Sequence, residues 1–278
     1  MARPFVSLLT DFGARDPSGA IMHGVILSIA PDARIVDISH EVHKYGIRDG
    51  ALLLWCALPY LPVGAHVAVV DPGVGTARRP VALEVARGDV LVGPDNGLLM
   101  AGADRLGGVV DARLLESEAH RLPVVSTSFH GRDIFAPAAA HLANGTRIED
   151  LGRQLDPATL VPSPIPDAVV EPDCLRSSIV YVDTFGNVKL AGLRRDLEAA
   201  IGPVRSGDRL TLAFAAVAPD NGDMHQELAW RDTFGGAEPG DLLLYEDSYG
   251  RICLAENQGN AAARLGLEAD RPVTIRRG

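Results

Sequence analysis

The sequence predicts an α/β domain with a mostly parallel sheet, followed by a smaller domain built almost entirely of β-strands. Two observations carry this prediction. Strand-like apolar runs alternate with helical patterns through residues 1–158, whereas short strand-like runs separated by turns fill residues 174–278. Between them, residues 159–173 belong to a stretch rich in proline, which is the composition of an extended linker.

The first domain is predicted from the order of its elements. In chain order these are a strand at 5–13 ending in an acidic turn, a helix at 19–33 terminated by Pro31, a strand at 34–39, a helical pattern at 49–62, a strand and turn at 65–75, and strands at 81–85 and 90–97. Strands that alternate with helices imply a mostly parallel sheet covered on both faces.

Three carboxylates follow apolar strand-like runs in this domain. Asp11, Asp71 and Asp95 each come directly after such a run. Ligands of parallel α/β sheets bind beyond the carboxyl ends of the strands. We therefore expect the three carboxylates at one rim of the sheet.

The second domain is predicted from short apolar runs and turns. The expected strands are at 177–190, 209–218, 241–247, 250–257 and 272–278, with one modest helix candidate at 193–200. This pattern is typical of a small antiparallel barrel or sandwich.

Composition limits the classes of function. Of the 278 residues, 47% are hydrophobic and 22% charged, which is the composition of a globular protein, and the net charge of -10 argues against a nucleic-acid partner. That charge suits a cationic ligand.

The cysteines, Cys56, Cys174 and Cys253, lie far apart and outside any CxxC spacing, as expected for reduced thiols. With neither a signal peptide nor a long apolar run in the sequence, we expect a soluble, cytoplasmic protein without a membrane partner.

Two stretches concentrate charge and glycine. "DPGVGTARR", residues 71–79, lacks the spacing of a dinucleotide or P-loop phosphate cradle. "HGRD", residues 130–133, precedes a small-residue helix, and by itself it allows a purely structural interpretation in which Arg132 and Asp133 form an ion pair. We predict instead that the two stretches meet at one pocket.

Taken together, several motifs point to a known family. "LLTDFG", "DPGVGTARR", "GPDNG", "FHGRDIFAPAAAHLA", "DTFGN" and "NQGNAA", in this order, resemble the S-adenosyl-L-methionine hydroxide adenosyltransferases, the hydrolase relatives of the fluorinating and chlorinating enzymes. The resemblance implies an N-terminal Rossmann-like α/β domain, a C-terminal β-barrel, and a homotrimer whose active sites lie between subunits. The implied reaction converts S-adenosyl-L-methionine and water into adenosine and L-methionine, with S-adenosyl-L-methionine as substrate and no cofactor.

The resemblance also implies a catalytic set, which falls on Asp71, Arg78 and His130. Attack of water at the ribose C5′ expels a neutral thioether, so the leaving group needs no acid. The difficulty lies in the nucleophile, because bulk water has a pKa of about 15.7. Arg78 can stabilise hydroxide-like charge, while Asp71 or His130 orients the water and accepts its proton.

The substrate-binding residues implied by the resemblance lie in both domains. Asp11 is expected to bind the ribose hydroxyls, since one carboxylate can accept both hydrogen bonds. The remaining candidates are Asp16 and Asp183 for the ammonium or sulfonium, Ser248 and Tyr249 near the carboxylate, Phe185, Asn187, Asn257 and Gln258 around the adenine, and Tyr45 and Phe129 as walls of the site.

Three other functions remain open from sequence. A halogenase is disfavoured because Asp71 would repel a halide. A metal-dependent hydrolase would use His40, Asp71, His130 and Asp133 as ligands. A non-catalytic adenosine-binding module would need Asp11 and Asn187 but not the catalytic set.

Overall fold

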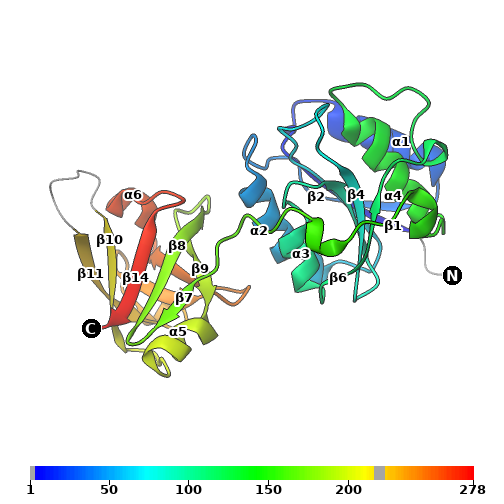
Figure 1. Cartoon of the computed structure of the whole chain (residues 1–278). Coiled ribbons are helices and arrows are strands. Elements are labelled where there is room, and N and C mark those ends of the chain that lie inside the picture. Colours follow the sequence, from blue (N-terminus) through cyan, green and yellow to red (C-terminus); the bar gives the residue numbers. More distant parts are fainter. Residues whose placement is uncertain (1–3, 216–222) are drawn as a thin grey trace. The chain divides into compact units, whose positions relative to one another are not determined.

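The computed structural model describes residues 4–215 and 223–278, and the chain divides into two compact units, residues 1–164 and 165–278 (Figure 1). The predicted linker, 159–173, therefore includes the division. The last residues of the strand predicted at 209–218, from 216 onward, lie outside the described residues.

The first unit contains a six-stranded sheet in the order β2-β1-β3-β5-β4-β6. Its strands are β1 (Phe5–Thr10), β2 (Arg34–Ser39), β3 (Ala65–Val69), β4 (Pro80–Val85), β5 (Val90–Pro94) and β6 (Val109–Leu114). The pairs β1–β2, β1–β3 and β3–β5 are parallel, whereas β4 runs antiparallel to β5 and β6. The reversal has a covalent cause, because the short segment 86–89 can make a hairpin but not the long crossover that parallel strands need.

Helices cover both faces of this sheet, as predicted. They are α1 (Ser18–Ile29), α2 (Ile47–Ala57), α3 (Met100–Arg105) and α4 (Ala136–Ala143), and α1 contacts α4 while α2 contacts α3. Successive side chains of a strand point to opposite faces. Leu8 of β1 packs in the cluster that includes α1 and α4, whereas Leu9 faces Gly50 of α2.

The described residues also contain short helical turns. They are the 3-10 turns Leu58–Tyr60, Glu118–His120, Ile148–Leu151, Pro157–Thr159 and Phe234–Gly236, and the π-helical turn Gly131–Phe135 that precedes α4.

The second unit is a closed β-barrel, as the resemblance implied. Its strands are β8 (Cys174–Val182), β9 (Val188–Leu193), β10 (Arg209–Ala215), β11 (Asp223–Trp230), β12 (Leu242–Glu246), β13 (Arg251–Glu256) and β14 (Pro272–Arg277), and pairing of β14 with β8 closes the ring. β7 (Val169–Glu171) extends it beside β8. Most pairs are antiparallel, but β11 and β12 are parallel.

The described residues of the barrel unit include two α-helices, α5 (Arg194–Ile201) and α6 (Ala261–Leu265). α5 was predicted. α6 was not predicted, because a five-residue helix is too short to show a hydrophobic periodicity. It is capped by the Asn260 side chain, which accepts from the Ala263 N–H at 2.8 Å.

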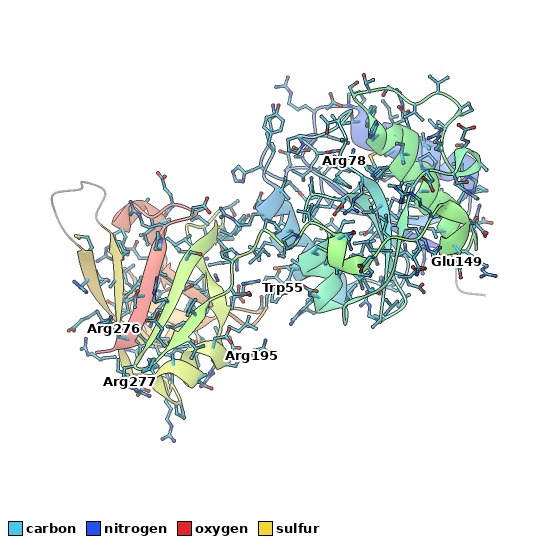
Figure 2. The ribbon with its side chains drawn as sticks, in the orientation of Figure 1. Trp55, Arg78, Glu149, Arg195, Arg276 and Arg277 are labelled. Carbon is cyan, nitrogen blue, oxygen red and sulfur yellow. The ribbon has the colours of Figure 1, made fainter. Side chains whose placement is uncertain are left out.

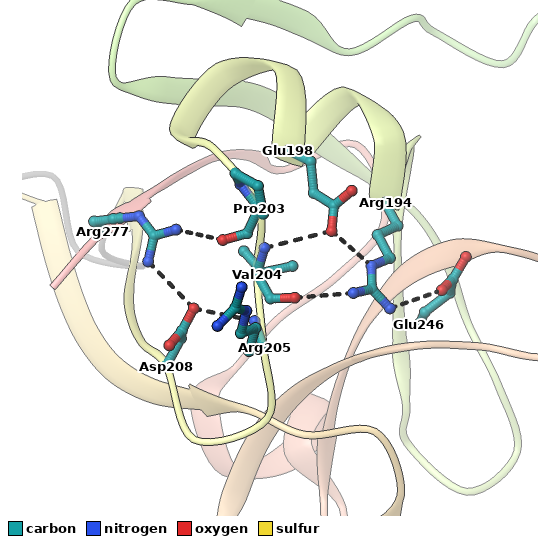
Figure 3. Close-up of polar contacts among 8 residues, drawn as sticks. All are labelled: Arg194, Glu198, Pro203, Val204, Arg205, Asp208, Glu246 and Arg277. Atoms are coloured by element: carbon teal, nitrogen blue, oxygen red, sulfur yellow. Dashed lines mark hydrogen bonds and ion pairs between the residues drawn. The ribbon is translucent and has the colours of Figure 1, made fainter.

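An arginine network joins α5 to the loop 202–208 (Figure 3). Arg194 donates from Nε to Glu198 at 2.9 Å and from Nη2 to the Val204 carbonyl at 2.9 Å, while Arg277 donates from Nη1 to Asp208 at 3.2 Å. The bond to Val204 satisfies a backbone carbonyl in the loop. Together the bonds fix this edge of the barrel.

Candidate active site

Asp71 is positioned by the end of β3 and by the turn that follows it. The Asn96 side chain donates to the carbonyl of Val70 at 2.8 Å, which holds the backbone just before Asp71. Gly75 has φ +76, and a Cβ there would lie 2.3 Å from the Thr127 carbonyl. The turn 71–79 therefore packs directly on the segment before His130, and only glycine allows that approach.

His130 stands at the start of the π-helical turn Gly131–Phe135. π-turns inside helices are frequent at functional sites. The turn is held by Asp133, whose buried carboxylate accepts from the Ser126 N–H at 2.8 Å and pairs with Arg132 Nε at 2.6 Å. The ion pair considered for Arg132 and Asp133 is thus confirmed, and it shapes the loop that carries His130.

The structure brings Asp71, Arg78 and His130 into direct contact. Arg78 donates from Nε to Asp71 Oδ1 at 3.1 Å and from Nη2 to Asp71 Oδ2, and Nη2 also lies 3.0 Å from His130 Nδ1. The Arg78 and Asp71 side chains are only 8% and 4% exposed. Figure 2 marks Arg78 in the first unit. The two charged stretches meet here.

The contact with Arg78 fixes the protonation of His130. A guanidinium only donates, so Nδ1 of the imidazole must accept and Nε2 must hold the ring proton. Burial, together with the positive charge of Arg78, lowers the pKa of His130 from its usual 6.5. The imidazole is therefore neutral at pH 7, and its ring proton is on Nε2.

This arrangement predicts an acidic limb in the pH profile of turnover. As the pH falls through the lowered pKa of His130, an imidazolium forms, Nδ1 stops accepting from Arg78, and turnover should fall with a midpoint below 6.5. Steady-state kcat between about pH 4.5 and 9, in buffers of constant ionic strength, gives the midpoint of this acidic limb. His130→Asn keeps an acceptor but does not titrate, so its residual activity should lack the limb. A midpoint above 6.5 would contradict the account.

A pocket of about 260 Å³ opens beside this set. Its lining residues are Asp11, Phe12, Lys44, Tyr45, Val69, Asp71, Val74, Ser128, Phe129, His130 and Gly131. Four stretches of the chain, 11–12, 44–45, 69–74 and 128–131, therefore contribute, and all belong to the first unit.

Asp11 and Tyr45 are coupled within this pocket. The Tyr45 N–H donates to Asp11 Oδ2 at 2.9 Å, and Tyr45 has φ +64, a conformation that costs energy for a residue with a Cβ. Tyr45 is 72% exposed. Phe129 packs edge-on against Phe12 with ring centroids 5.6 Å apart, which makes an apolar wall.

Two carboxylates expected near the pocket have other contacts. Asp16 is exposed and accepts from the Ser18 N–H at 2.9 Å, at the start of α1, and hydrogen bonding by the Ser18 side chain and this N–H lowers the pKa of Asp16. Asp95 accepts from Arg79 Nε at 2.7 Å and from the Val161 N–H at 2.9 Å. Asp95 therefore anchors the start of the Pro-rich segment instead of lining the pocket.

The second unit contains a separate pocket of about 760 Å³. Its lining residues are Asp183, Phe185, Asn187, Lys189, Phe234, Tyr245, Asp247, Ser248, Tyr249, Glu256, Gln258 and Gly259. Three carboxylates against one lysine make its lining acidic, which suits a cationic ligand.

The predicted residues of this pocket lie on tight turns. Asp183 Oδ1 accepts from the N–H groups of Phe185 and Asn187, both at 2.9 Å, which shapes the "DTFGN" turn. Asp247 does the same for Tyr249 and pairs with Lys189 at 2.6 Å.

Asn257 and Gln258 separate in the structure. The Asn257 side chain donates to the Ala237 carbonyl at 2.8 Å and holds a loop, and this residue does not line the pocket. Gln258 lines the pocket and has φ +59.

Several lining residues were not predicted from the sequence. Phe12 lies within "TDFG", and Lys44 and Asp247 adjoin predicted residues, so neighbouring motifs carried a signal for them. Glu256 likewise adjoins the predicted Asn257, whereas Phe234 and Tyr245 lie in plain turn and strand contexts, and only the fold brings these two to the pocket.

The ligand set of a metal-dependent hydrolase does not assemble. Asp71 and His130 both contact Arg78, Asp133 is paired with Arg132, and His40 contacts Asp37. Within residues 4–215 and 223–278, the group of three or more potential ligands that lie together is His23, Asp37 and His40. That hypothesis, with its four named ligands, is therefore wrong.

The fold and the first pocket define an enzyme of two units, an α/β unit with a buried carboxylate–guanidinium–imidazole set and a β-barrel with an acidic pocket. The chain belongs to the SAM hydroxide adenosyltransferase family, because the models of its N-terminal and C-terminal domains match residues 6–152 and 177–274. In the described part of the chain, no helix has the length and apolar character needed to cross a bilayer.

Curated and solved relatives agree with this membership. The (R)-S-adenosyl-L-methionine hydrolase of Salinispora tropica is 42% identical, covering 95% of this chain and 94% of that protein. A fluorinase of Nocardia brasiliensis is more distant, with 30% identity over 99% of this chain and 98% of its own. The crystal structure of an uncharacterized conserved protein from Thermotoga maritima matches with a TM-score of 0.88 and 31% identity, covering 98% of this chain and 100% of that one.

Proposed function

We propose that the protein hydrolyses S-adenosyl-L-methionine to adenosine and L-methionine. The water oxygen bonds to the ribose C5′, the C5′–S bond breaks with its electron pair going to sulfur, and one proton is released. The contact of Arg78 with both Asp71 and His130, beside the Asp11 pocket, is the observation that carries this proposal. Membership of the family and the names of the hydrolase relatives support it.

Arg78 stabilises the nucleophile. The guanidinium does not line the pocket itself, but it contacts Asp71 and His130, which do, and its Nη1 is buried without a hydrogen-bond partner among the described residues. Its positive charge acts in a site of low dielectric constant, where stabilisation of a hydroxide-like oxygen is worth more than in water.

Asp71 accepts the proton in this proposal. His130 Nδ1 already accepts from Arg78 and its Nε2 holds a proton, so the neutral imidazole has no unoccupied lone pair. Asp71 is acceptor-only and retains further lone pairs beyond those bound by Arg78. His130 Nε2–H then orients the water instead of taking its proton.

Substrate binding uses charge and shape in both pockets. Asp11 accepts the two ribose hydroxyls, with Phe129 and Tyr45 as walls. Asp183 and its acidic neighbours attract the ammonium and sulfonium, while Phe185, Asn187 and Gln258 surround the adenine, and Ser248 and Tyr249 lie near the substrate carboxylate. Asp16 remains a candidate for the ammonium by its place in the motif, and Asn257 acts through the loop it holds.

A halogenase is the alternative, and Asp71 disfavours it. Two like charges about 4 Å apart repel by about 4 kcal/mol at an effective dielectric constant near 20. That repulsion lowers the affinity for a halide roughly a thousandfold, and attraction to Arg78 offsets part of the loss.

Incubation of the purified protein with S-adenosyl-L-methionine, followed by chromatography, tests the proposal. Adenosine with L-methionine is expected, with or without added chloride or fluoride. A 5′-halo nucleoside would support the halogenase instead, and methylthioadenosine or S-adenosylhomocysteine would mean cleavage of another bond. Binding without turnover would leave an adenosine-binding module.

Assembly is a further part of the proposal. Because the ribose pocket and the acidic pocket belong to different units of the chain, we propose that complete sites form in a homotrimer. Light scattering should give the mass of three chains. A fully active monomer would contradict this. Independence of any cofactor and a cytoplasmic location also remain proposals.

A further inference from the structure

Outside the two pockets, two imidazoles converge on one carboxylate. His23 lies on α1, Asp37 on β2, and His40 directly after β2. His23 Nε2 lies 2.7 Å and His40 Nε2 3.2 Å from the same oxygen, Asp37 Oδ1. One potential ligand atom from each residue lies within 4.8 Å of the others.

We propose that His23, Asp37 and His40 bind a divalent first-row transition ion, Zn²⁺ in particular. Imidazole nitrogen suits such ions, whereas Mg²⁺ and Ca²⁺ favour oxygen ligands alone, so two imidazoles and one carboxylate favour a first-row transition ion. In the metal-free protein, each Nε2 must carry a proton to contact Asp37 Oδ1. The ion takes the place of the proton at each Nε2, and the ring proton of each neutral imidazole moves to Nδ1.

The spacing of the ligand atoms can be compared with that of a tetrahedral site. Bonds of about 2.0–2.2 Å from Zn²⁺ to nitrogen and oxygen place neighbouring ligand atoms about 3.3 Å apart. The His40 Nε2 to Asp37 Oδ1 distance, 3.2 Å, already fits, whereas His23 Nε2, at 2.7 Å from the same oxygen, has to move away by about 0.6 Å. The fourth position faces solvent, since the side chains of His23 and Asp37 are 31% and 41% exposed.

His40 is held in the orientation that a ligand needs. Its Nδ1 lies 2.8 Å from the Thr10 hydroxyl, so Nδ1–H donates there when Nε2 binds the ion. Gly19 of α1 gives the ring its space, because a Cβ at that position would lie 2.9 Å from His40 Nε2. Such outer-shell contacts are the usual support of metal-binding histidines.

The proposed site adjoins the substrate pocket through the backbone. Thr10 precedes Asp11, and the Gly13 N–H donates to the carbonyl of His40 at 2.7 Å. An ion on His40 would therefore stabilise the turn 10–13 that carries Asp11. Its role here is structural, and it takes no part in the attack on C5′.

Metal binding by the untagged, full-length protein tests this inference directly. After removal of metal with a chelator, the wild type should bind one Zn²⁺ per chain, measured by calorimetry. Co²⁺ should give a visible ligand-field absorption, and Zn²⁺ should raise the midpoint of thermal unfolding. His23→Ala, a change that α1 tolerates because alanine favours helix, should weaken binding at least about tenfold and remove the absorption.

Two further variants make the test specific. Asp37→Asn should weaken binding as His23→Ala does, while retaining the size of the side chain. His43→Ala removes an imidazole that is 83% exposed and outside the cluster, and His130→Ala removes the histidine of the catalytic pocket; both should still bind one ion. No stoichiometric binding by the wild type, or unchanged binding by His23→Ala and Asp37→Asn, would overturn the proposal. Loss of binding in His130→Ala would place the ion elsewhere and overturn it too.

Discussion

Arg78→Ala is expected to lower kcat for hydrolysis of S-adenosyl-L-methionine by about a hundred- to a thousandfold, or about 2.7–4 kcal/mol of barrier. Arg78 is the cation that contacts Asp71 and His130. It acts on charge that develops mainly in the transition state, so KM should change much less than kcat. Steady-state kinetics at saturating substrate gives both constants.

Neighbouring variants show whether the effect is specific. Asp71→Ala and His130→Ala should also depress kcat, whereas Asp11→Ala should mainly raise KM, because ribose hydroxyls are bound in ground and transition states alike. Arg79 lies next to Arg78 but binds Asp95 and the Thr159 carbonyl. Arg79→Ala should therefore retain kcat within a few-fold. Near-normal turnover in Arg78→Ala would refute the role assigned to Arg78.

Asp89→Ala is expected to cost about 3–5 kcal/mol of unfolding free energy. Asp89 is fully buried and accepts from His66 Nε2 at 2.9 Å and from Arg87 Nε at 2.7 Å, while His66 Nδ1 lies 2.7 Å from Ser7 Oγ. This serine–histidine–aspartate arrangement is buried throughout, so it is a structural network. Removing the carboxylate leaves an imidazole and a guanidinium without their partner.

The same network predicts acid sensitivity. Burial raises the pKa of Asp89, but the hydrogen bonds and charges of His66 and Arg87 outweigh it and lower that pKa to about 2. A lowered pKa contributes stability that is complete above the unfolded value of 3.8 and is lost as the pH falls toward 2.

Denaturant unfolding of wild type and variants measures both effects. Glu149, whose pKa is also about 2 because of Arg147, is a matched control on the surface, labelled in Figure 2. Glu149→Ala should change stability little, because an exposed ion pair is screened by water. Equal effects of the two substitutions would contradict the structural role of Asp89.

Helices and strands with a clear hydrophobic periodicity could be predicted from the sequence. Weakly patterned strands and the antiparallel direction of one strand could not. α1, α2 and the strands of the parallel part have apolar runs of the right length. β11, whose sequence is "DMHQELAW", alternates weakly and was not predicted. The prediction of a mostly parallel sheet does not specify the direction of β4, which follows from the short 86–89 link.

The contacts of a predicted site residue depend on pairs far apart in the chain. Asp71 and His130 could be named from motifs, but their shared contact with Arg78 requires the approach of Gly75 to Thr127. Asp95 follows a strand at the same rim, yet Arg79 and Val161 occupy its carboxylate. The partners of a carboxylate decide its role, and a motif does not contain them.

Other features have no local signal at all. Ser7 meets His66 because β1 and β3 pair in that register, and Asp89 joins them from the loop before β5. The His23, Asp37 and His40 cluster likewise needs α1 to pack beside the edge strand β2.

Hydrolysis in oxygen-18 water tests the central claim most directly, because it reports which atom the nucleophile attacks. Single-turnover incubation with S-adenosyl-L-methionine and mass spectrometry of both products locate the label. Attack at C5′ predicts one oxygen-18 in the 5′-hydroxyl of adenosine and none in L-methionine. Label in the methionine, or an adenosine whose 5′-oxygen does not come from water, would contradict the mechanism built on Asp71, Arg78 and His130.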